Sequence, residues 1–107
     1  MKKLVCAVLL LVLVSVAHAE PTGDPITITV LRAYTSASDP AVFLEVSSNA
    51  LCGTSAFAIS LNIPGGKEMY AAALTAFVTK QKVRLEIANA TGCQGWGTRL
   101  QSIFLVE

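Results

Sequence analysis

The sequence has little charge and almost no histidine. Its 107 residues include eight lysines and arginines, seven aspartates and glutamates, and one histidine. That histidine, His18, lies in an N-terminal segment that we expect to be removed, which excludes Ser-His-Asp or Cys-His catalysis and histidine-containing zinc sites. The carboxylates are scattered along the chain, and Pro64-Gly65-Gly66-Lys67 lacks the spacing of a phosphate-binding loop. We therefore predict a protein that is not an enzyme and that needs no cofactor or metal.

The N-terminal segment has the three parts of a secretory signal peptide. Met1–Lys3 is basic, Leu4–Val16 is apolar apart from Ser15, and Ala17-His18-Ala19 has the small residues of a cleavage site. The apolar run is too short to span a bilayer as one helix, which needs about 20 residues. The sequence predicts a signal of bacterial type, cleavage after Ala19, and a secreted or periplasmic location.

Removal of residues 1–19 would leave one domain, Glu20–Glu107, of 88 residues. It keeps six basic and seven acidic side chains, and this balance argues against nucleic-acid binding, which depends on lysine and arginine. It also keeps two cysteines, Cys52 and Cys93. In an exported protein an even pair of cysteines predicts a disulfide, with a redox-active or metal-bound pair as the alternative.

The pattern of apolar residues predicts five strands and one helix. Apolar and polar residues alternate in Ile26–Val30 and Lys82–Ala88, as they do in half-buried strands. Pro64-Gly65-Gly66 ends a strand, and Glu68 suits the first turn of the helix that follows. The predicted strands are Ile26–Val30 with a continuation to Tyr34, Ala41–Val46, Thr54–Ile63, Lys82–Ala88 and Thr98–Val106, and the predicted helix is Lys67–Thr79.

Three strands, a helix and two more strands is the element order of the OB-fold, a five-stranded barrel. In that fold the third and fifth strands are parallel neighbours, so the loops that precede them lie close together. Cys52 and Cys93 lie in these two loops, and a disulfide requires Cα atoms within about 7 Å. We therefore expect a mainly β domain with one helix, folded as an OB-like barrel; a two-layer α+β sheet is the alternative.

The predicted helix has no charged side chain from Met69 to Thr79. One apolar stripe is expected to pack on the sheet: Tyr70, Leu74, Phe77 and Val78. The other side is rich in alanine, and we predict that it contacts a second copy of the protein through Met69, Ala72, Ala73 and Ala76. The alternative is an alanine-rich helix that faces solvent without charge.

Two loops carry the candidate ligand-binding residues. In an OB-fold the first and the last interstrand loops border the ligand face. The first loop offers an aromatic ring, hydroxyls and a carboxylate that suit a sugar: Tyr34, Thr35, Ser36, Ser38 and Asp39. The second loop offers Asn89, Gln94 and Trp96. The alternatives are a solvated turn capped by Asp39 and a tryptophan that packs in the core or on the disulfide.

Short segments spread over residues 20–88 share the pattern of a known family. Glu20-Pro21-Thr22-Gly23-Asp24 is similar to its Glu-Trp-Thr-Gly-Asp opening, and Asp39-Pro40 with Phe43-Leu44-Glu45 is similar to its second strand. Ser55-Ala56 and Gln81-Lys82-Val83-Arg84-Leu85 are similar to a later strand and to its Gly-Gln-x-Val-Arg-Ile stretch. The chain thus resembles the pentameric binding subunits of bacterial toxins of the subtilase-cytotoxin and typhoid-toxin kind.

The resemblance implies an OB-fold, a ring of five copies with the helices around a central pore, and binding of cell-surface glycans. The segment that supplies polar glycan contacts in the family is missing between Asp24 and Ile26, and the part from Asn89 onward does not match, so no glycan-contact residue carries over. We expect a secreted, non-enzymatic binding protein that recognises glycans or a cell surface as a homo-oligomer. The alternative is a periplasmic protein-binding module such as an enzyme inhibitor.

Overall fold

Strands and helix follow one another in the order that the sequence predicts. The structure, a computed structural model, describes residues 23–34 and 38–107. It contains β1 (Ile28–Tyr34), β2 (Ala41–Val46), β3 (Ala56–Ser60), α2 (Gly66–Thr79), β4 (Val83–Ile87) and β5 (Thr98–Leu105). The predicted signal peptide lies outside these residues, and none of the helices within them is long and apolar enough to cross a membrane.

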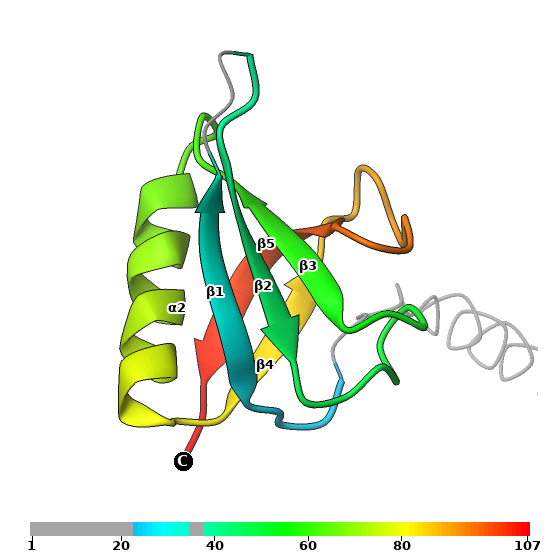
Figure 1. Cartoon of the computed structure of the whole chain (residues 1–107). Helices are drawn as coiled ribbons and strands as arrows, with labels where there is room; N and C mark the ends of the chain where they lie inside the picture. The colour runs from blue at the N-terminus through cyan, green and yellow to red at the C-terminus, as the bar shows by residue number, and fades with distance from the viewer. Residues whose placement is uncertain (1–22, 35–37) are drawn as a thin grey trace, which may run out of the picture.

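The five strands form one mixed sheet in the order β1-β2-β3-β5-β4 (Figure 1). β3 and β5 are parallel neighbours, as predicted, and the other pairs are antiparallel. The sheet is not a closed barrel. One isolated bridge links the two edges of the sheet, since it joins Ile26, just before the edge strand β1, to Val83 of the edge strand β4. In this bridge each backbone N–H donates to the other residue's carbonyl oxygen at 2.8 Å.

The core lies on the side of the sheet that α2 covers. Alternation places the larger apolar side chains of each strand on this inner face because successive residues of a strand point to opposite sides. The fully buried large side chains include Val42 and Leu44 of β2, Phe57 and Ile59 of β3, and Leu85 of β4. The prediction for β3 was too long: the strand ends at Ser60, and Ile63 is exposed in the turn that leads to α2.

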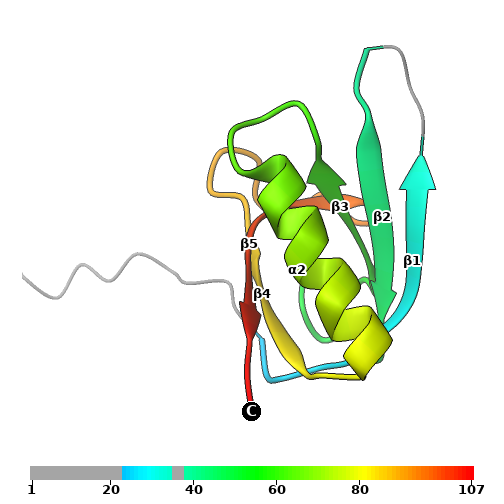
Figure 2. The ribbon, with the colours of Figure 1, turned by 90° about the vertical axis from the view of Figure 1, so that its left-hand side faces the viewer.

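Helix α2 crosses the open side of the sheet, with β1 and β2 to one side and β4 and β5 to the other (Figure 2). It packs against β1, β3 and β5. The predicted orientation of this helix is wrong. Met69, Ala73 and Ala76, expected at an oligomer interface, are buried against the sheet, and Ala72 is half-buried. The stripe expected in the core is turned outward or flanks the contact: Leu74 and Val78 are exposed, and Tyr70 and Phe77 are half-buried.

Small side chains on the inner stripe explain this orientation. Gly66, Met69, Ala73 and Ala76 recur at the spacing of one helix face, and three of the four are glycine or alanine. Such a stripe lets the helix backbone lie close to the sheet. The approach is closest at Gly66, where a Cβ atom would lie 2.1 Å from the backbone carbonyl oxygen of Ser60.

The predicted disulfide is confirmed. Cys52, in the loop before β3, is bonded to Cys93, in the loop before β5, and their Cα atoms are 5.4 Å apart. The parallel pairing of β3 and β5 brings the two loops together, because it places the starting ends of both strands side by side. The disulfide therefore anchors the long loop between β4 and β5, which projects on the right of Figure 1.

Candidate functional site

Three aromatic side chains form a connected cluster on the outer face of the sheet, and we call it the aromatic surface: Tyr34, Phe43 and Trp96. The ring centroids of Tyr34 and Phe43 are 5.7 Å apart at an edge-to-face angle of 78°. Those of Phe43 and Trp96 are 5.1 Å apart with a tilt of 33°. Both geometries are favourable for aromatic pairs. Trp96 is 63% exposed and Tyr34 is 48% exposed, so the two outer rings remain open to a ligand.

The register of four strands places Phe43 in the middle of this face. Arg32 of β1, Phe43 of β2, Ala58 of β3 and Arg99 of β5 are successive cross-strand partners. Cross-strand partners point to the same side of a sheet, so one row has an arginine at each end. The Arg32 guanidinium lies 5.0 Å from the centre of the Tyr34 ring, within the range of a cation–π contact.

Arg99 connects the far end of this row to the loop between β1 and β2. Its guanidinium donates hydrogen bonds to the Ser60 hydroxyl and to the Asp39 carboxylate, with which it also forms an ion pair. The Asp39 side chain is 46% exposed, so the ion pair itself contributes little to stability. Its consequence is geometric, since it ties the chain at Asp39, just before β2, to Arg99 of β5, which also contacts Ser60 of β3.

Trp96 reaches the aromatic surface from the loop before β5. Gly95 and Gly97, on either side of it, both have φ in the left-handed region, at 72° and 80°. The Gly97 N–H donates to the Ala56 carbonyl oxygen at 2.9 Å. A Cβ atom on Gly97 would be 3.6 Å from the Phe43 ring, so the backbone here passes directly over that ring.

The structure brings some of the predicted ligand-binding residues together and separates others. Tyr34 and Trp96 are joined through Phe43, and Asp39 is joined to the same face through Arg99. Ser38 is exposed beside Asp39. Thr35 and Ser36 lie outside the described residues.

Gln94 and Asn89 take part in the structure of the second loop. The Gln94 side-chain oxygen accepts the backbone N–H of Arg99 at 3.2 Å, which uses one of its polar groups internally. The backbone N–H of Asn89 donates to the side-chain oxygen of Gln101 at 2.8 Å, and Asn89 is exposed. This bond joins Asn89 to Gln101 of β5 and not to the aromatic surface.

Three residues of this site were not predicted from the sequence: Arg32, Phe43 and Arg99. A signal for Phe43 was present. Val42, Leu44 and Val46 alternate as the inner face of a strand, which leaves Phe43 and Glu45 on the outer face. An aromatic ring on the outer face of a strand is unexplained unless something covers it or binds to it. The two arginines could not be found in this way, because their neighbours are set by strand pairing.

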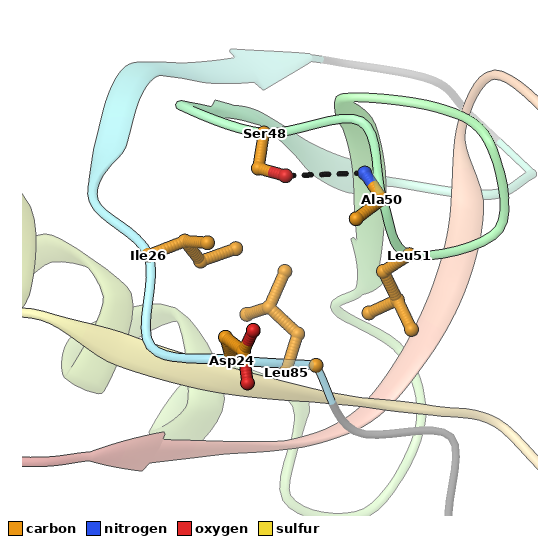
Figure 3. Close-up of a pocket in the computed structure, with 7 residues that line it drawn as sticks. Asp24, Ile26, Ser48, Ala50, Leu51 and Leu85 are labelled. Carbon is orange, nitrogen blue, oxygen red and sulfur yellow. Dashed lines mark hydrogen bonds between the residues drawn. The ribbon is translucent and has the colours of Figure 1, made fainter.

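A small cavity opens on a different part of the molecule, between the segment before β1, the loop after β2, and β4 (Figure 3). Its lining is mostly apolar: Gly23, Asp24, Ile26, Ser48, Ala50, Leu51 and Leu85. The Ala50 N–H donates to the Ser48 hydroxyl at 3.1 Å and shapes one wall. The cavity volume is about 60 Å³, well below the roughly 300–1,000 Å³ of small-molecule pockets, so it is too small for a sugar.

A wider groove of about 390 Å³ runs between the start of α2 and β5. It is lined by Ile63, Pro64, Gly65, Glu68, Met69, Ala72, Gln101, Ser102 and Ile103. One of these side chains is charged and none is aromatic. The groove therefore offers a ligand fewer specific groups than the aromatic surface does.

The aromatic surface carries groups that are suited to holding a ligand. It combines exposed ring faces with guanidinium, hydroxyl and carboxylate groups at its edge. Throughout the part of the chain that the structure describes, no three histidine, cysteine, aspartate or glutamate side chains come together as metal ligands. Comparisons of the chain with protein-family models, with curated proteins and with solved structures give no match.

Proposed function

We propose that this chain is an exported, non-enzymatic binding protein that recognises glycans on a cell surface through Tyr34, Phe43 and Trp96. The observation that carries the proposal is the exposure of two aromatic rings on either side of a third. A single exposed ring is common on protein surfaces, but adjoining exposed aromatic rings form an apolar patch of the kind that marks interaction sites. A sugar ring offers an apolar C–H face to such a ring, and its hydroxyls need a few polar groups at the rim.

The position of the site in the sheet supports this choice. We infer that the sheet is an OB-like, incompletely closed barrel, whose two edges are linked by the single bridge between Ile26 and Val83. OB-folds bind oligosaccharides and oligonucleotides on the face around their second and third strands, between the first and last interstrand loops. Phe43 lies on β2, and Tyr34 and Trp96 come from these two loops or their borders. The resemblance to toxin binding subunits points to the same ligand class.

We also propose that the protein associates with itself through the outward side of α2. Because the inner stripe is buried, the contact would use the exposed residues Ala71, Leu74, Thr75 and Val78, which have no charge. In size-exclusion chromatography with light scattering, the mature chain should elute as a ring of about five copies. Val78→Glu should yield a folded monomer, whereas Val30→Glu, at another exposed valine on β1, should leave the mass unchanged. A monomeric mature chain would contradict self-association.

A glycan array tests the ligand. The disulfide-intact mature protein should bind a restricted set of glycans, and Trp96→Ala should weaken that binding at least about tenfold, the effect of a hot-spot residue. Phe104→Ala is the matched control, because Phe104 is an exposed aromatic residue paired across the strands with Arg84, away from the aromatic surface. Both variants need an unchanged circular dichroism spectrum. An array without signal for the unmodified protein would contradict glycan recognition.

One observation favours a second candidate, a protein-binding module such as an enzyme inhibitor. Tyrosine, tryptophan and arginine dominate the hot spots of protein–protein interfaces, and here Tyr34, Trp96 and Arg32 lie at one site. This candidate predicts an empty glycan array together with inhibition of a specific enzyme that Trp96→Ala abolishes and Phe104→Ala preserves.

A further inference from the structure

Trp96 lies at the tip of a turn that Thr98 helps to close with both its side chain and its backbone. The turn comprises residues 94–98. The Thr98 hydroxyl accepts the backbone N–H of Gln94 at 2.9 Å and donates to the carbonyl oxygen of Gly95 at 2.6 Å. The backbone N–H of Thr98 donates to the same Gly95 oxygen at 3.1 Å. Three of the connections that close the turn around Trp96 therefore end on Thr98.

Thr98 has an unusual position for a residue with a polar side chain. Its exposed fraction is 0%, and it is the one polar residue in the buried set of residues 23–34 and 38–107. A buried hydroxyl is unfavourable unless it is hydrogen-bonded, and here both its donor and an acceptor position are used. Packing in the core holds the Thr98 side chain in one position, and its hydroxyl is bonded to the backbone of the turn. Thr98 therefore connects the turn to the core.

The backbone around Trp96 would be mobile without further hydrogen bonds. Glycine has more backbone freedom than any other residue, and Trp96 has a glycine on each side. The disulfide holds Cys93, which lies before the turn, and the Gly97 N–H bond to Ala56 holds the chain after the indole. Neither of these contacts spans Trp96 itself. The bonds of Thr98 do, and so does the bond from the Arg99 N–H to the side-chain oxygen of Gln94, but the Thr98 hydroxyl is the group that is buried in the core.

We propose that Thr98 is a positioning residue for Trp96: its buried hydroxyl closes the turn and keeps the indole against Phe43 before a ligand arrives. In its effect on affinity, this proposal rests on the proposed function. When the Trp96 ring is already in place, binding does not have to order it, and the entropic cost of binding is lower. Positioning of the ring therefore increases the affinity for the ligand. In its effect on Trp96 geometry, the proposal is independent of the ligand.

Two variants of Thr98 separate the hydroxyl from the methyl group. Thr98→Val keeps the shape and removes the hydroxyl, and Thr98→Ser keeps the hydroxyl and removes the methyl group. Trp96 is the single tryptophan of the chain, so the tryptophan band in near-ultraviolet circular dichroism reports on it alone. Thr98→Val should lose most of that band, as side chains that lose fixed packing do, while Thr98→Ser should retain it.

Glycan affinity should follow the same order. The loss of two hydrogen bonds predicts binding about tenfold weaker for Thr98→Val, and Thr98→Ser should restore it to near the unmodified value. An unchanged tryptophan band in Thr98→Val, or equal losses in both variants, would overturn the positioning role. Absence of glycan binding by the unmodified protein would overturn the proposed function instead, because the spectroscopic comparison needs no ligand.

Amide hydrogen exchange tests the same bond without a variant, should Thr98→Val fail to fold. The Gln94 amide is bonded to the Thr98 hydroxyl although Gln94 is an exposed residue. Its exchange in the unmodified protein should be at least about tenfold slower than that of the Trp96 amide at the tip of the turn. Equal rates for the two amides would overturn the proposal.

Discussion

Replacement of both Cys52 and Cys93 by alanine should lower the free energy of unfolding by about 4 kcal/mol. The two cysteines are 41 residues apart in the sequence, and the chain-entropy estimate for a loop of this length gives about 4 kcal/mol at 25 °C. Small domains have a total stability of about 5–15 kcal/mol. The double variant should therefore retain only part of its stability, and it should be partly unfolded if the total lies at the lower end.

The structure indicates that this loss originates in the unfolded chain. Cys93 is exposed and Cys52 is half-buried, so truncation to alanine removes little packing from the folded state. The loops also keep other connections, including the bond between Gly97 and Ala56. Without the disulfide the unfolded chain gains conformational freedom, and this gain lowers the stability of the fold.

Urea denaturation followed by far-ultraviolet circular dichroism measures the effect. An unfolded chain without a cross-link is more expanded, so its dependence on urea, the m value, should rise as the extrapolated free energy falls. Oxidised unmodified protein serves as the reference, and reduced and alkylated unmodified protein should resemble the double variant. A loss below about 1 kcal/mol with an unchanged m value would refute the loop-entropy reasoning.

Three further predictions test the helix and the N-terminus. Ala73→Glu should destabilise the fold by about 3–5 kcal/mol in urea, because it places an unpaired carboxylate in the core, whereas Lys67→Glu, at an exposed helix position outside the proposed contact between copies, should stay within about 0.5 kcal/mol; similar losses would contradict the observed helix orientation. Gly66→Ala should cost about 2 kcal/mol in thermal unfolding, since its Cβ would meet the Ser60 carbonyl oxygen at 2.1 Å; an unchanged melting temperature would contradict that close approach. Intact-mass measurement of the exported protein should give a chain that begins at Glu20, and a mass that includes residues 1–19 would contradict the predicted signal cleavage.

The error in the helix orientation has an identifiable physical cause. A helix with one apolar and one charged side can be oriented from its sequence, because the charged side must face solvent. Here both sides of the segment Met69–Thr79 are apolar or uncharged, so that criterion does not apply. The larger side chains Leu74 and Val78 would bury more apolar area. The sheet instead accepts the smaller stripe, and at the start of that stripe the backbone of Gly66 lies too close to Ser60 for a larger residue.

Two of the three aromatic residues of the candidate site were predicted from the sequence, and the central one, Phe43, was not. Tyr34 and Trp96 were identified because aromatic residues in loops are conspicuous, and the structure joins them through Phe43. The roles of Gln94 and Thr98 as internal hydrogen-bonding partners were not visible in the sequence. A side chain in a loop can bind a ligand or the loop itself, and only the folded geometry decides between these.

By itself, the sequence determined the local structure of this protein and one long-range contact. Alternation of apolar residues, a proline-glycine stop and an uncharged helical segment were sufficient for the element order, because these signals act within a few residues. The cysteine pair was sufficient for the contact between the loops before β3 and β5, because disulfide chemistry leaves few other partners.

Tertiary structure alone decided which side of α2 is buried, how far the sheet closes, and which side chains meet on its outer face. The row from Arg32 through Phe43 to Arg99 joins strands that lie up to 67 residues apart in the sequence. Such a row depends on strand register, and a shift of one residue would turn every side chain to the other face. Register is set by packing over the whole sheet, so no local pattern in the chain could have specified it.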